Sequence, residues 1–427
     1  MSDDVLELQQ PLTADGIRSV NFFNGRLLTG RDLTREQRAR READTRLGLA
    51  RGDGVAFGLD VVSDGQPPPP ALPVVSVTPG LAITRTGRTL RLGRKVTINL
   101  ARRFEAPAAD RLFGDCTPIV GGSYIAGAGV CLLTIAPAEL PEGRANSNAL
   151  DPANVRCATD VTVEGVQFRL ILIRRAAYAG LDTGAETFRN ELAYRCFGAG
   201  IDAAWFGDLL RAASRGDDLL ETARQSEELT DEDVPLALLF LAGAEELRFI
   251  DVWSARRPLA EAGGAALPSL ARPRRIAVGE AMFRQFQQQV DELATPGAGL
   301  GSVTAASHFR YLPPAGLIPV RADAPGESVE ATRFFAGMTI RGPAFLNAAQ
   351  LEGLIRESVV FPRIDVRSGE MIWLYRIREN HQPPAAPGPP PARLPGYVVF
   401  ASGHLPYRAN ARYDLAYFDY ANYAIDD

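Results

Sequence analysis

The chain has 427 residues, enough for two or three domains with a sizeable hydrophobic core. Hydrophobic residues make up 46% and charged residues 23%, as in ordinary globular proteins, and the net charge of −5 gives no electrostatic case for a nucleic-acid partner. The acidic, polar N-terminus is unlike a signal peptide, and no apolar run approaches the ~20 residues that span a bilayer.

The four cysteines are far apart and form no CxxC pair: Cys116, Cys131, Cys157 and Cys196. This spacing predicts buried, reduced thiols rather than a zinc site. Reduced thiols in turn indicate a reducing cytoplasm at synthesis.

Residues 1–52 are expected to form an N-terminal arm and a charged docking helix. The arm ends in an aromatic turn, Phe22-Phe23-Asn24-Gly25, and a helix is predicted over about Leu33–Arg51. Asp32 or Thr34 is the expected N-cap, and a cap at Thr34 would place Gln37 where it completes a capping box. The helix is rich in Arg and Glu, with few and mostly small apolar residues. Such a helix usually forms a solvated face or lies between subunits.

Residues 53–180 are expected to form a β-rich domain, because short apolar runs alternate with Gly and Pro turns. The pattern indicates a small antiparallel β-sandwich or barrel. A long loop is predicted at Pro141–Arg156. The predicted strands are Val55–Val62, Val74–Thr78, Leu81–Arg85, Thr89–Leu92, Val96–Leu100, Gly129–Ala136 and Val161–Ile173.

Residues 181–300 have a helical period, and the longest apolar run of the chain, Val234–Ala244, is interpreted as a buried helix. The predicted helices of this middle region are Ala203–Ala213, Leu219–Glu228, Asp231–Val252 and Ile276–Ala294.

Residues 301–427 are expected to form an α+β C-terminal domain, which makes the whole chain a multidomain α+β protein. It opens with an extended aromatic-proline segment, His308–Val320, and ends in an aromatic tail, Tyr407–Tyr423. A helix is predicted at Ala348–Ser358. Strands are predicted at Arg363–Val366, Met371–Arg376 and Gly396–Ala401.

The aromatic turn has an internal echo. Phe22, Phe23 and Gly25 begin an FFxGxxxxG pattern that returns at Phe334-Phe335-Ala336-Gly337. Coincidence and a repeated docking turn both account for it.

The sequence predicts no catalytic residue, cofactor or metal site. Its three histidines are widely separated, and neither GxSxG nor a phosphate-binding GxxxxGK[ST] occurs. Adjacent acidic residues such as Glu245-Glu246 do not share a helix face, so they indicate solvated surface. The aromatic tail suits either a glycan-binding surface or an interface.

Several segments together resemble a group of proteins encoded with contractile injection systems and phage-tail-like particles. The resemblance covers the first hundred residues well and the last hundred and twenty moderately. One departure is Arg51-Gly52-Asp53-Gly54-Val55, where many relatives have HGxGV. The segments that carry it are Phe22–Thr29, Asp32-Leu33 with Glu36-Gln37, Gly52–Val61, Val77–Gly93, His308–Val320 and Pro362–Val366.

The resemblance implies a structural, non-enzymatic subunit of such a particle, in its baseplate, fibre attachment or cap. Its partners would be other subunits of the particle, with a homotrimer or homohexamer expected by analogy. The subunit would be cytoplasmic at synthesis and then part of the particle, with release from the cell left open. The predicted docking residues are Phe22, Phe23, Gly25, Arg26 and Leu27, together with Phe334, Phe335 and Gly337 of the echo.

Three alternatives stay open. Phe22 and Phe23 are equally well explained as core residues of the chain itself. The protein is alternatively a carbohydrate- or receptor-binding appendage of the same particle. A cell-wall hydrolase is the third, although it would need two converging carboxylates and the sequence nominates none.

Overall fold

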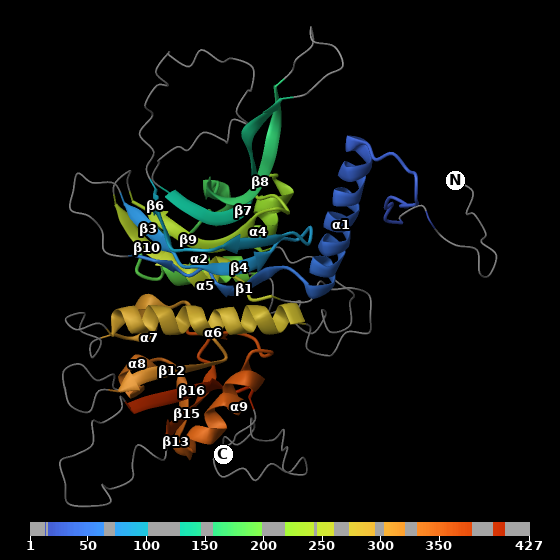
Figure 1. Ribbon diagram of the computed structural model, residues 1–427. Helices are drawn as coiled ribbons and strands as arrows, with labels where there is room; N and C mark the ends of the chain where they lie inside the picture. Colours follow the sequence, from blue (N-terminus) through green and yellow to red (C-terminus); the bar gives the residue numbers. More distant parts are fainter. Residues whose placement is uncertain are drawn as a thin grey trace, which may run out of the picture.

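The computed structural model describes residue 13 and residues 16–63, 73–100, 129–146, 157–198, 218–242, 246–259, 273–294, 303–320, 331–377 and 396–405. These residues form a multidomain α+β structure. A first body (residues 54–259) and a second body (residues 303–405) lie on opposite sides of one long helix, and another long helix stands beside the first body (Figure 1). The predicted helix Ala203–Ala213 and the aromatic tail fall outside the described residues. Among the helices described, none has the length and apolar character needed to cross a bilayer.

The first body begins with two three-stranded antiparallel sheets, ordered β1-β4-β5 and β2-β3-β6. The side chains of β5 alternate: Leu90 and Leu92 are buried, while Thr89 and Arg91 are exposed. The strand predictions for this region are confirmed to within a few residues, except that the predicted strand Val55–Val62 is two strands in different sheets. The strands are β1 (Gly54–Gly58), β2 (Val61–Val62), β3 (Val74–Val77), β4 (Gly80–Ile83), β5 (Thr89–Leu92) and β6 (Val96–Asn99).

A four-stranded antiparallel sheet, ordered β10-β9-β7-β8, completes the first body. One face of it, including Leu133 and Ile135, packs on the two small sheets. The other face, including Val130 and Leu132, packs on helices. The strands are β7 (Gly129–Asn146), β8 (Cys157–Leu172), β9 (Val234–Leu241) and β10 (Leu247–Asp251), and the helices are η2 (Arg175–Tyr178), α2 (Phe188–Phe197), α4 (Leu219–Gln225) and α5 (Val252–Ala255).

Two predictions in the first body are wrong. The apolar run predicted as a helix over Asp231–Val252 is mostly strand, because β9 is buried between the layers on both faces of the sheet. Such a strand reads as a continuous apolar run, which periodicity cannot distinguish from a buried helix. The predicted loop Pro141–Arg156 is also partly strand. Residues 141–146 pair with 157–162, so β7 and β8 form a ribbon that extends beyond the sheet (Figure 1).

The long helix α6 (Pro273–Leu293) separates the bodies, and the second body holds a four-stranded sheet ordered β12-β16-β15-β13. Only β13 and β15 pair in parallel within this sheet. One sheet face packs on α6, and the other packs on α9. The elements are α7 (Ala305–His308), β11 (Tyr311–Leu312), β12 (Ala315–Val320), α8 (Ala331–Phe334), β13 (Thr339–Leu346), α9 (Ala348–Ser358), β14 (Ile364–Asp365), β15 (Met371–Ile377) and β16 (Gly396–Ser402).

A buried polar cluster fixes α6 against the first body. The Asp251 carboxylate accepts hydrogen bonds from Arg189 Nε at 3.1 Å, from Gln285 Nε2 at 2.9 Å and from the Ser254 backbone N–H at 2.9 Å. Arg189 also donates to Glu292 of α6, and its guanidinium Nη2 lies 3.1 Å from Glu292 Oε1. The pKa of Arg189 is raised: burial opposes its charge, and the two carboxylates outweigh burial. The cluster therefore joins α2, α5 and α6 through paired charges.

Candidate docking surface

Helix α1 (Gly30–Arg51) begins one turn earlier than predicted, and its cap is Thr29 rather than Asp32 or Thr34. The Asp32 backbone N–H donates to Thr29 Oγ1 at 3.3 Å, and the Thr29 N–H donates to Asp32 Oδ2 at 3.0 Å. This reciprocal pair is a capping box, with Asp in the place where Glu is commoner. The Thr34 hydroxyl instead donates back to the Gly30 carbonyl inside the helix. Asp32 is therefore the third helical residue and not the cap.

The hydrogen bonds of the capping box also act on Asp32 itself. Those from the Thr29 side chain and backbone, followed by one from Arg26, lower the pKa of Asp32 to about 2. Asp32 is therefore ionised at neutral pH, and its negative charge lies at the helix N-terminus, where the helix dipole favours it.

Helix α1 attaches to the first body along one narrow line. Near its C-terminal end, a Cβ at Gly48 would lie 2.0 Å from the Gly87 carbonyl oxygen, so the helix and the β4–β5 turn meet backbone to backbone. Farther up, Arg41 pairs with Glu164 of the ribbon at 2.6 Å. Only Ala39 and Gly48 are buried in the whole helix. Packing against its own chain therefore covers little of α1, which leaves most of its surface open (Figure 1).

The arm before α1 is held to the helix by polar groups of its backbone and of one arginine. The Val20 N–H donates to Glu36 Oε2 at 3.1 Å. Arg26 donates to the Asn21 carbonyl at 2.7 Å and to Asp32 at 2.6 Å. The Arg26 N–H closes the aromatic turn on the Phe23 carbonyl at 3.2 Å. Val20 is buried, but these bonds fix the course of residues 20–29 without burying Phe22, Phe23, Leu27 or Leu28.

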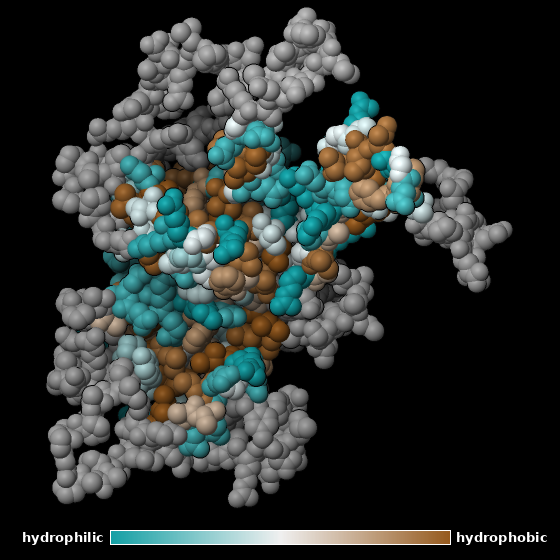
Figure 2. Space-filling view, in the orientation of Figure 1, coloured by the Kyte–Doolittle hydropathy of each residue, from teal (hydrophilic) through white to brown (hydrophobic). Residues whose placement is uncertain are grey.

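Those apolar side chains point to solvent. Phe22 is 56% exposed, Phe23 62% and Leu27 90%, and Leu28 and Leu33 beside them are also exposed. Figure 2 shows hydrophobic residues gathered at this end of the molecule. Burying one such side chain is worth about 1.5–3 kcal/mol, so the cluster has a large free energy to gain from a partner. We call these five residues, Phe22, Phe23, Leu27, Leu28 and Leu33, the arm cluster.

The predicted docking turn at Phe334–Gly337 has a different setting. Phe334 is 1% and Phe335 0% exposed, and both rings belong to the core between α6 and the second sheet. Phe335 packs edge-on against Phe400 with ring centroids 5.2 Å apart. Gly337 lies in the turn with a positive φ of 91°. Because their rings are buried in the core, Phe334 and Phe335 cannot be surface docking residues in this fold, which corrects that part of the prediction.

The titratable groups of the described residues do not assemble a metal centre. Within the parts of the chain that are placed, no three His, Cys, Asp or Glu side chains lie close enough to share an ion. His308 lies 3.8 Å from Glu186, and burial lowers its pKa. Cys131 and Cys196 are buried free thiols, and burial raises the pKa of Cys131 to about 11. His381 and Cys116 lie outside the described residues.

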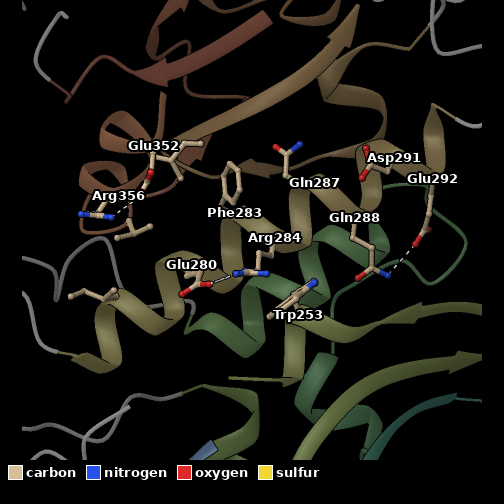
Figure 3. A pocket seen from close by; sticks show the side chains of 13 residues that line it. Trp253, Glu280, Phe283, Arg284, Gln287, Gln288, Asp291, Glu292, Glu352 and Arg356 are labelled. Atoms are coloured by element: carbon tan, nitrogen blue, oxygen red, sulfur yellow. Dashed lines mark hydrogen bonds and ion pairs between the residues drawn. The ribbon is translucent and has the colours of Figure 1, made fainter. Parts of the chain in front are cut away.

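The structure also shows a groove that sequence reasoning missed. It lies along the solvent face of α6 and has a volume of about 1250 Å³. Trp253 of α5 lines one side, and Glu352 and Arg356 of α9 line the other (Figure 3). Ile355 of α9 and its C-cap residue Val359 also line the groove. The only signal in the sequence was a pair of apolar residues, Ile276 and Phe283, spaced seven apart on an otherwise polar helix face.

The similarity of this chain to proteins of known structure is distant. No protein-family model matches the chain, and no curated protein matches it. Among solved structures, the crystal structure of TssK aligns with a TM-score of 0.25 and 11% sequence identity. The alignment covers 66% of this chain and 51% of TssK, so the chain spans about half the length of that structure.

Proposed function

We propose that this chain is a non-enzymatic structural subunit of a contractile injection system or phage-tail-like particle, which docks onto neighbouring subunits through its arm and α1. The observation that carries the proposal is the arm cluster. Phe22, Phe23 and Leu27 are held outward by a polar network on a helix that makes few contacts with its own chain. Monomeric proteins rarely leave such a contiguous apolar patch open unless it serves an interaction.

The sequence resemblance supplies the kind of partner. Phe22–Thr29 and the following helix belong to the first hundred residues, which the resemblance covers well, and they form the arm and α1. A position in the baseplate, at the fibre attachment or at the cap fits a subunit that works by burying surface rather than by chemistry. Assembly as a trimer or hexamer belongs to the same proposal. A carbohydrate- or receptor-binding role would rest on Tyr407–Tyr423, which lie outside the described residues.

The test removes the apolar surface and keeps the helix cap. In the triple variant Phe22→Ser, Phe23→Ser, Leu27→Ser, the capping box of Thr29 and Asp32 stays intact, so circular dichroism should match the wild type. We expect the variant to be lost from purified particles when the tagged protein is quantified against a sheath or tube subunit.

A matched control separates docking from a general loss of surface hydrophobicity. The double variant Leu140→Ser, Phe57→Ser removes two side chains that are 69% and 62% exposed and belong to neither the arm nor α1. It should enter particles at the wild-type ratio. If the arm variant also enters at that ratio, the arm is not the docking element and the proposal fails.

A further inference from the structure

Helix α1 carries the arm cluster at the end farthest from the strand that follows the helix. The helix begins at Gly30, directly after the arm, and ends at Arg51, shortly before β1. Its 22 residues correspond to about 33 Å at 1.5 Å per residue. Figure 1 shows the helix standing beside the first body, with the arm at its far end. A change in the tilt of α1 therefore moves the arm cluster over a long distance.

Two glycines form the crossing between α1 and the first body. A Cβ at Gly48 would lie 2.0 Å from the Gly87 carbonyl oxygen, and a Cβ at Gly87 would lie 2.2 Å from the Thr45 carbonyl oxygen. Side-chain ridges that fit into grooves normally set the angle at which a helix packs. Glycine contributes no ridge, so this crossing fixes the position of α1 on the β4–β5 turn more firmly than its angle.

A group of charged side chains holds α1 at a second point. The Arg41 guanidinium of α1 lies 2.6 Å from a Glu164 carboxylate oxygen and 3.9 Å from one of Glu139, both in the ribbon. Arg88 of the β4–β5 turn lies 3.3 Å from the same Glu139 oxygen. We call these four residues, Arg41, Arg88, Glu139 and Glu164, the ion cluster. Arg41 is about 10 Å along the helix axis from Gly48, so the ion cluster sets the angle that the glycine crossing leaves open.

The register of the ribbon favours α1 in this position. Glu139 and Glu164 are directly opposite each other across β7 and β8. Like charges in such a pair destabilise the two strands. Arg88 brings a positive charge to Glu139, and Arg41 of α1 brings one to Glu164. The paired carboxylates of the ribbon therefore attract the helix.

The ion cluster is weak enough to open. The Arg41 side chain is 57% exposed, that of Glu164 55% and that of Glu139 43%. Exposed ion pairs contribute little to stability, and salt screens them. The glycine crossing involves no ion pair and is not screened in this way. Salt or a competing charge should thus release the angle of α1 while the crossing stays in place.

We infer that α1 is a lever for the arm, with the Gly48–Gly87 crossing as its pivot and the ion cluster as the latch that holds it beside the ribbon. The inference rests on the proposed docking role of the arm and adds how the arm is positioned. The arm begins about 28 Å from Gly48, so a tilt of about 20° moves the arm cluster by about 10 Å. One subunit thereby presents its arm at more than one angle.

The distance between two spin labels in the full-length chain measures the tilt. One label is attached at Gln37→Cys on α1 and the other at Arg91→Cys in β5, both exposed positions. The native cysteines other than Cys131 and Cys196, which are buried, are replaced by serine. With the ion cluster intact and at low salt, double electron–electron resonance should give one narrow distance.

Reversing the charge of Arg41 should open the latch. In Arg41→Glu the ratio of held to tilted helix should fall by at least about 5-fold, because attraction to the ribbon becomes repulsion. About 1 M salt, with a screening length of about 3 Å, should shift the unchanged ion cluster in the same direction. The swap of Arg41→Glu with Glu164→Arg restores opposite charges and should restore the narrow distance. The control Arg38→Glu makes the same charge change at an exposed position of α1 and should leave the distance unchanged.

Two results overturn the inference: an unchanged distance distribution in Arg41→Glu, or a swap variant whose distribution stays as broad as that of Arg41→Glu alone. If Arg41→Glu loses its circular dichroism spectrum, the salt series on the unchanged ion cluster decides. A distribution that does not change up to about 1 M salt then overturns the latch.

Failure of the latch is distinguishable from failure of the proposed function. The triple variant of Phe22, Phe23 and Leu27 leaves the ion cluster intact and reports on docking alone. If that variant is lost from particles while Arg41→Glu keeps the wild-type distance, the docking role stands and the latch is wrong. If the triple variant enters particles normally, the proposed function fails, whatever distance the labels report.

Discussion

Two turns of nearly the same sequence have opposite surroundings in this chain. Phe22–Gly25 and Phe334–Gly337 share the same backbone: Gly25 has a φ of 88° and Gly337 a φ of 91°, and each turn closes with a hydrogen bond to the carbonyl of its second Phe, at 3.2 Å and 3.1 Å. The rings differ completely. The first pair is more than half exposed, and the second pair is buried in the core.

The difference shows that a short motif specifies a turn and not its role. Glycine is the third of the four turn residues in both places, Phe23–Arg26 and Phe335–Met338. There it supplies the positive φ that a type II turn requires. The next element along the chain decides whether the rings are buried. A charged helix comes shortly after the first turn, whereas β13, a strand paired with β15, comes after the second and brings Phe334 and Phe335 against Phe400.

Truncating one ring in each turn should give the largest contrast. Phe335→Ala removes a fully buried ring and should lower the free energy of unfolding of the second body by about 3–5 kcal/mol. Phe23→Ala removes an exposed ring and should change it by less than about 0.5 kcal/mol. Both changes in free energy of unfolding are measured by urea denaturation. The signal is the fluorescence of Trp373, in a background in which Trp205→Phe and Trp253→Phe remove the other two tryptophans. Equal losses of unfolding free energy in the two variants would show that the two pairs of rings have the same environment.

The same contrast explains what could be predicted from sequence. Elements with one solvated face were predicted well, such as α9 and the strands β5 and β6, because their period is visible. The strand β9 was mistaken for a helix because it is buried on both faces and shows no period. Of the candidate site, the turn and the polar helix were predictable. The burial of Phe334 and the groove beside α9 depend on contacts between distant segments, which local patterns do not contain.

Breaking an arginine–aspartate pair should likewise lower stability more where the pair is buried than where it is exposed. Arg189→Met leaves the buried Asp251 without its charged partner and should cost about 3–5 kcal/mol of stability at most. Arg26→Met removes the partly exposed pair with Asp32 and should cost at most about 1 kcal/mol. Thermal unfolding by calorimetry compares the two. A small loss at Arg189 would mean that the α2–α5–α6 junction does not depend on that pair.

Replacing the turn glycines should give equal local effects and unequal global ones. A Cβ at Gly25 or at Gly337 meets no atom within 4 Å, so only the positive φ is penalised, by about 1–2 kcal/mol. Gly337→Ala should lower the stability of the second body by that amount. Gly25→Ala should leave global stability unchanged and speed hydrogen exchange of the Arg26 amide by about 5–30-fold. A global loss at Gly25 would place the arm inside the cooperative fold.

The smallest expected effect is a pH dependence present in one helix cap and missing from the other. Helix α1 is capped through Asp32, which accepts the Thr29 N–H at 3.0 Å, whereas α9 is capped through Gln350, which accepts the Asn347 N–H at 3.0 Å. The pKa of Asp32 is lowered from 3.8 to about 2, first by hydrogen bonds from Thr29. A carboxylate with a lowered pKa contributes its stabilisation above its unfolded pKa and loses it as pH falls through the folded pKa.

The Thr29 cap should therefore be constant from pH 7 down to about 4 and weaken between pH 4 and 2. The Asn347 cap contains no titrating group and should stay constant over the same range. The amide shifts of Thr29 and Asn347, followed by NMR while circular dichroism shows the fold intact, give the comparison directly. In Asp32→Asn the Thr29 shift should lose its pH dependence. A parallel change at Asn347 would instead assign the effect to acid unfolding of the whole chain and not to the cap that positions the arm.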